Sequence, residues 1–189
     1  NVWDTDYDIF MEGFTCDDPP VSEFYTQNFA HSSSRPDNPV LAEQLLVRII
    51  SNCPYAYRKI DRLLKHFPNV DFHYNNNQPM IEAIVGGELL DVKCVEKKTN
   101  LKFFDTFHYG DVENKMLIDF ALQEEDDEIV EYMLKQDAEQ NGVSLYDRHP
   151  DKCDQIFNIM AECGGEDALN AVKFIRNLNP QRYKVETNE

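Results

Sequence analysis

The fold is decided by the segment QPMIEAIVGGEL, residues 78–89. Its apolar residues recur at helical spacing after Pro79, a residue that suits the first turn of a helix. Gly86 and Gly87 then mark a tight turn, because glycine adopts backbone conformations that other residues avoid. The segment therefore predicts a short helix over 79–85, a turn, and a second helix over 88–97.

Three further helix pairs follow the same plan. Helical periodicity covers 39–50 and 57–67 in the first pair, 115–124 and 126–136 in the third, and 152–162 and 166–177 in the fourth. Asn75, Asn76 and Asn77 form a turn cluster in the loop before the second pair. Helix pairs with short internal turns and longer connections are typical of stacked repeats. We expect eight helices in antiparallel pairs, with little strand.

The second and third pairs resemble the ankyrin repeat. That family's motif has a Pro at the start of the first helix, an Ala four residues later and a Gly at the turn. Pro79, Ala83 and Gly87 hold these places. In the third pair, Ala121 and residues 128–135 match the motif, whereas the turn glycine is replaced around Glu125.

The resemblance extends over residues 40–178. In the fourth pair Ala161 and Gly165 match. Pro79, Leu117 and Phe157 hold equivalent places, so the repeat periods are 38 and 40 residues. These periods exceed the family's usual length of about 33 residues, so the connecting loops are longer. The resemblance implies an all-α, ankyrin-like helical repeat solenoid. A generic helical bundle is the alternative.

Small residues in the first helices have a physical reason in this interpretation. Ala83, Ala121 and Ala161 hold equivalent places in three pairs. Paired helices approach closely there, and a larger side chain would overpack the contact.

The chain flanks differ from this helical body. Residues 1–38 alternate acidic with aromatic residues, and the first basic residue is Arg35. Pro19, Pro20 and Pro36, with Pro39 just after the segment and the serine run 32–34, forbid a long helix there. We expect an irregular acidic segment whose aromatic side chains pack on the body, with a free partner-binding tail as the alternative. The body is the domain 39–178, and residues 179–189 form a polar C-terminal tail.

The charge excludes several classes of function. The chain has 18 Lys and Arg and 35 Asp and Glu, for a net charge of −17. Such a charge disfavours binding to nucleic acids or to anionic membranes unless basic residues cluster. The densest basic group, Arg58, Lys59, Arg62 and Lys65, fits the solvated side of one helix. No apolar run approaches the roughly 18 residues of a membrane helix.

The five cysteines predict a reducing compartment. Their number is odd and no pair has C-x-x-C spacing, which argues against a disulfide framework or a zinc module. The chain has no glycosylation sequon and no basic start followed by an apolar core. We expect a cytoplasmic or nuclear protein. Because the first residue is Asn, we also expect the chain to be part of a longer protein.

A nuclease of the restriction-enzyme-like class is the alternative function. Asp71, Asp91 and Lys93 resemble its motif, in which carboxylates hold Mg²⁺ and a lysine supports the attacking water. Glu82 would add a ligand. That chemistry needs Asp91 and Lys93 on one face of a β-strand. The helical pattern instead separates them by about 200° around a helix.

The sequence favours a non-catalytic protein-interaction module, without metal or other cofactor. An aromatic-His-Tyr pattern recurs in two loops, and concave faces of helical repeats bind partners. The candidate partner-binding residues are Phe72, His73, Tyr74, Asn76, Glu82, Phe107, His108, Tyr109, Asp111 and Asp119.

The partner expected for this surface is a protein with a basic surface or segment, because the chain is acidic. Nucleic acid and membrane are not expected partners. The alternative is that residues 1–38 occupy the surface and inhibit it. The divergence of the repeats is compatible with a pathogen or viral factor that binds a host protein.

Overall fold

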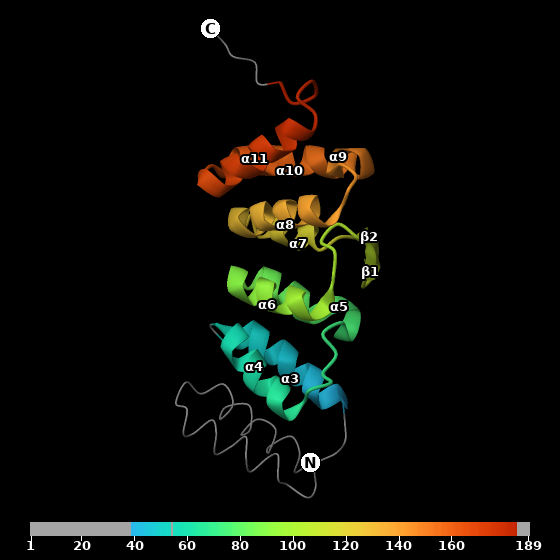
Figure 1. Cartoon of the computed structure of the whole chain (residues 1–189), viewed down its shortest axis with the longest axis vertical. Coiled ribbons are helices and arrows are strands. Elements are labelled where there is room, and N and C mark those ends of the chain that lie inside the picture. Colours follow the sequence, from blue (N-terminus) through green and yellow to red (C-terminus); the bar gives the residue numbers. More distant parts are fainter. Residues whose placement is uncertain (1–38, 54, 185–189) are drawn as a thin grey trace, which may run out of the picture. The chain divides into compact units, whose positions relative to one another are not determined.

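The computed structural model describes residues 39–53 and 55–184, and these are mostly helical, with one small two-stranded sheet (Figure 1). They fall into two compact units, one ending at Thr99 and the other beginning at Asn100. The expectations for residues 1–38 lie outside the described part of the chain. None of the described helices is long and apolar enough to cross a membrane.

The first unit contains two helix pairs. The pairs are α3 (Pro39–Asn52) with α4 (Ala56–His66), and α5 (Tyr74–Val85) with α6 (Leu89–Thr99). Helix α3 packs on α4 and α5, and α6 packs on α5 and α4. Their shared core consists of apolar side chains that are almost fully buried: Leu45, Leu46, Ile49, Ile60, Leu63, Met80, Ile84, Val92 and Val95.

The turns of this unit agree with the sequence. Asn75, Asn76 and Asn77 all adopt left-handed backbone angles, so the right-handed part of α5 begins after them. Asparagine tolerates this conformation better than most residues. After α5, Gly87 has a φ of 72°, a left-handed conformation that glycine adopts readily and that fits the predicted turn. The predicted turn cluster and the predicted Gly-Gly turn are confirmed.

The second unit contains two further pairs, a hairpin and a short extra helix. Its elements are β1 (Phe107–Tyr109), β2 (Val112–Lys115), α7 (Ile118–Gln123), α8 (Asp127–Gln140), α9 (Leu145–Arg148), α10 (Pro150–Cys163) and α11 (Glu166–Leu178). Helix α8 packs on α7 and α11, and α10 packs on α9 and α11. The core side chains include Phe104, Leu117, Ile118, Ile129, Met133, Leu134, Ile156 and Ile175.

The eight predicted helices are all present in the described residues, and the all-α class is confirmed. Two elements were not predicted: the antiparallel β1–β2 hairpin and α9. As a result α7 begins at Ile118 and not at Lys115, which belongs to β2. Tyr183, in the predicted polar tail, is also buried and stacks on Phe157 of α10, with ring centroids 4.7 Å apart.

The three alanines predicted at helix contacts differ in their burial. Ala83 and Ala121 are buried, at 1% and 0% exposure, as expected for positions of close helix approach. Ala161 is exposed on α10, so the prediction for that position was wrong. In the fourth pair the fully buried alanines are Ala168 and Ala171 of α11, a helix that packs on both α10 and α8.

We predict that Ala121→Leu destabilises the protein by about 1–3 kcal/mol, because the added atoms overpack a filled core. Ala161→Leu is the matched control and should change the free energy of unfolding by less than about 0.5 kcal/mol, since its site is exposed. Denaturant unfolding measures both values. Equal effects of the two substitutions would contradict the burial of Ala121.

A second prediction concerns the turn between α7 and α8. Glu125 has a φ of 55°, a left-handed conformation that strains most residues other than glycine. Glu125→Gly removes this strain while adding entropy to the unfolded chain, so we expect a net stabilisation of about 0.5 kcal/mol. Thermal unfolding measures it, and a lower melting temperature would contradict the strain.

Candidate functional site

The β1–β2 hairpin is fixed on α7 by an aromatic cluster. The ring centroid of Phe120 lies 5.2 Å from that of Tyr109 and 6.5 Å from that of Phe107. Lys115 places its ammonium 4.9 Å from the centroid of the same ring. Phe120 itself is buried at 7% exposure. Such aromatic and cation–π contacts give the short hairpin an anchor that two strands alone lack.

The tip of the hairpin presents apolar side chains to solvent. Tyr109 pairs across the strands with Val112, and the two side chains are 38% and 54% exposed. Gly110, with a φ of 58°, and Asp111 form the two-residue turn between them. His108, Asp111 and Glu113 are exposed around this pair. We call Tyr109, Val112, Asp111, Glu113 and His108 the hairpin tip.

Sequence reasoning found part of this site and missed the rest. It identified Phe107, His108, Tyr109 and Asp111 but did not predict strands, so Val112 was not considered. The signal was present, since Gly110-Asp111 is a two-residue pair of the kind that forms tight hairpin turns, and aromatic residues and Val112 flank it.

The other predicted loop lies in the first unit and is mainly structural. Phe72 is buried at 6% exposure, so it is not available to a partner as predicted. The His73 amide donates to Asp71 Oδ1 at 2.8 Å, and its ring Nδ1 lies 2.9 Å from Asn77 Oδ1. Tyr74 is half-buried, and His73 and Asn76 are exposed.

The two predicted acids on first helices are engaged inside their own units. Glu82 is half-buried and accepts hydrogen bonds from Ser51 Oγ at 2.8 Å and from Gln78 Nε2 at 3.3 Å. Asp119 is buried, accepts the Met116 amide at 2.9 Å and forms an ion pair with Lys152 of α10. Both carboxylate oxygens of Asp119 therefore have partners within its own unit, and its predicted contact with a partner protein stays a prediction.

The residues of the nuclease alternative do not form its required geometry. Asp91 and Lys93 lie on α6, not on a strand. Asp91 is buried, and its carboxylate accepts the amides of Ala56 at 3.1 Å and of Tyr57 at 2.6 Å, at the start of α4. Burial raises the pKa of Asp91, and these two hydrogen bonds oppose that rise. Among the described residues, no group of three or more His, Cys, Asp or Glu is placed to hold a metal ion.

Comparison of the chain with protein-family models, with curated proteins and with solved structures gives no match. The arguments about function therefore depend on the geometry of the chain itself.

We predict that Asp91→Ala destabilises the protein by about 1–3 kcal/mol, because it leaves two backbone donors at the start of α4 without their acceptor. Asp61→Ala, which removes an exposed carboxylate from α4, is the control and should have an effect below about 0.5 kcal/mol. Denaturant unfolding compares the two. A Mg²⁺-dependent rise in melting temperature that Asp91→Ala abolishes would instead support the metal-site alternative.

Proposed function

We propose that this chain is a non-catalytic protein-interaction module that binds a basic segment of another protein. The observation that carries the proposal is the hairpin tip: an exposed apolar pair, Tyr109 and Val112, beside exposed acids, on a hairpin anchored to buried Phe120. Exposed aromatic and aliphatic side chains on a rigid support are typical anchors of protein interfaces.

The charge around this pair favours a basic partner. Asp111 and Glu113 flank Val112, and Asp105 is also exposed, just before β1. The acidic net charge of the chain adds a long-range attraction, which raises association rates mainly at low salt. Complementary charge then selects among partners, and the apolar pair supplies contact area.

An ankyrin-like assignment of the helix pairs is part of this proposal. It is supported by the Pro79, Ala83 and Gly87 pattern, by the burial of Ala83 and Ala121, and by the position of the hairpin, in the long connection before a helix pair. Modules of that kind bind partners with their loops and first helices and carry no catalytic group. The number and spacing of the cysteines support a reducing compartment, cytoplasm or nucleus, as part of this proposal.

Val112→Arg tests the site with a matched control. Val112 is 54% exposed, so arginine there should leave the fold intact while repelling a basic partner. Val143→Arg adds the same charge at a position that is 57% exposed in the same unit. Proteins captured by the wild-type chain are compared by quantitative mass spectrometry with those captured by each variant, and affinities are then measured for the purified partners.

We predict that Val112→Arg weakens binding of the true partner by about tenfold or more, the effect of losing one central interface contact, whereas Val143→Arg leaves it within about twofold. The affinity should also fall as salt rises, because complementary charge contributes to it. A partner that binds both variants and the wild-type chain equally well, at low and high salt, would contradict the proposed site.

A further inference from the structure

The first unit contains a groove of about 320 Å³ between α4 and α6. It shares no residue with the hairpin tip. Its lining combines apolar and basic side chains: Tyr57, Leu90, Cys94, Lys93, Lys97 and Lys98, with Asp61 as the one acid. Leu90 is 47% exposed, so the groove offers an accessible apolar side chain. We call this feature the α4–α6 groove.

Cys94 contributes to the apolar part of the groove. Burial raises the pKa of its thiol, and nearby Asp61 raises it further, so the group stays a neutral thiol at physiological pH. A protonated, half-buried cysteine behaves as a small apolar side chain. The groove is therefore suited to binding an apolar side chain and not to nucleophilic chemistry.

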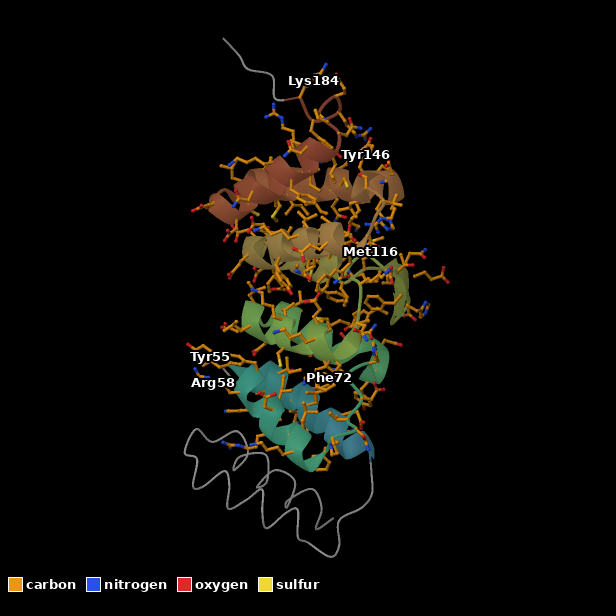
Figure 2. The ribbon with its side chains drawn as sticks, viewed as in Figure 1. Tyr55, Arg58, Phe72, Met116, Tyr146 and Lys184 are labelled. Carbon is orange, nitrogen blue, oxygen red and sulfur yellow. The ribbon has the colours of Figure 1, made fainter. Side chains whose placement is uncertain are left out.

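A preorganised cation lies at the start of α4, where it contacts Tyr57 of the groove lining. The guanidinium carbon of Arg58 lies 5.4 Å and 5.6 Å from the ring centroids of Tyr55 and Tyr57, and its Nε donates to the Tyr57 hydroxyl at 3.1 Å. Figure 2 shows Tyr55 and Arg58 close together at the start of α4. Tyr55 is 51% exposed and has a φ of 57°, so strained backbone holds a large aromatic side chain in solvent there.

Three lysines of α6 gather in this groove. Folding brings Tyr57 of α4 to the same groove as Lys97 and Lys98, which lie about 40 residues later in the chain. In a chain with a net charge of −17, such a basic, partly apolar groove is complementary to an acidic peptide that carries apolar side chains.

The chain itself contains a peptide of this chemistry. Residues 3–14, WDTDYDIFMEGF, have four acidic residues that alternate with aromatic and aliphatic ones, and no Lys or Arg. We propose that the α4–α6 groove binds residues 3–14 of the same chain, with their carboxylates on Lys97 and Lys98 and an apolar side chain against Leu90. The proposal is independent of the function of the hairpin tip.

The length of the connection permits this contact. Helix α3, which belongs to the same unit as the groove, begins at Pro39, and 24 residues separate it from Phe14. A chain of that length spans up to about 80 Å when extended, several times the diameter of a helix. Attachment to the same chain also gives the segment an effective concentration of the order of millimolar, which an acidic segment of a separate protein rarely reaches.

The single tryptophan of the chain, Trp3, lies in this segment and is its natural reporter. In the full chain at low salt, we expect Trp3 emission to be blue-shifted and protected from acrylamide, because its ring is removed from water on docking. The Lys97→Glu/Lys98→Glu variant should shift the emission to the red and lower the docking equilibrium by about tenfold, through lost ion pairs and new repulsion.

Two further variants keep the test decisive. Lys102→Glu/Lys173→Glu makes the same change of net charge at exposed lysines outside the groove and should leave Trp3 emission unchanged. Lys97→Gln/Lys98→Gln avoids placing acids at the end of α6, where the helix dipole disfavours them, and should give an intermediate red shift. Far-UV circular dichroism verifies that each variant is folded.

Three outcomes would overturn the proposal. Trp3 emission typical of full exposure to water in the wild-type chain would show that the segment does not dock. Protected emission that is the same in the Lys97→Glu/Lys98→Glu variant would show that it docks elsewhere. Protection that is lost on dilution by about a hundredfold would assign the groove to the segment of a second copy, since contact within one chain is independent of concentration.

Discussion

Backbone amides at the start of a helix have no acceptor within it, and where the helix start is buried another group must accept them. In this protein aspartate carboxylates take that role repeatedly. Asp91 of α6 accepts two amides at the start of α4, Asp126 caps α8, and Asp119 accepts the amide of Met116 just before α7. The packing of α6 on α4, and with it the groove between them, depends on the first of these contacts.

Because some aspartates accept buried helix-start amides, the acidic composition overstates the negative charge that the surface presents. A sequence with 35 acidic residues suggests a surface that attracts cations, yet several of its carboxylates are directed inward. Asp91, Asp119 and Asp137 are all buried, and Asp137 forms an ion pair with Arg148. Removing one partner of such a pair leaves an uncompensated charge, which is costly in the interior. The internal contacts of these acids give them a role in stabilising the fold.

Two groups of partly exposed charged side chains form surfaces of opposite character. At the hairpin tip, acids surround an exposed apolar pair, and the pair is held in place by a buried ring. In the α4–α6 groove, lysines surround an exposed leucine. Each surface combines a charge that selects a ligand with an apolar side chain that adds contact area, but they select ligands of opposite sign.

The sequence by itself determined the helix pairs, because the 3.6-residue period, Pro39 and the Asn75–Asn77 cluster are local signals that tertiary contacts did not override. It also placed Ala83 and Ala121 in the interior. Only the tertiary structure decided that Phe72 is buried, that Ala161 is exposed and that Asp91 caps a helix 35 residues earlier. The same holds for the groove that Tyr57 and Asp61 of α4 share with the α6 lysines. Such relations join positions far apart in the chain, and no local pattern encodes which helix faces will meet.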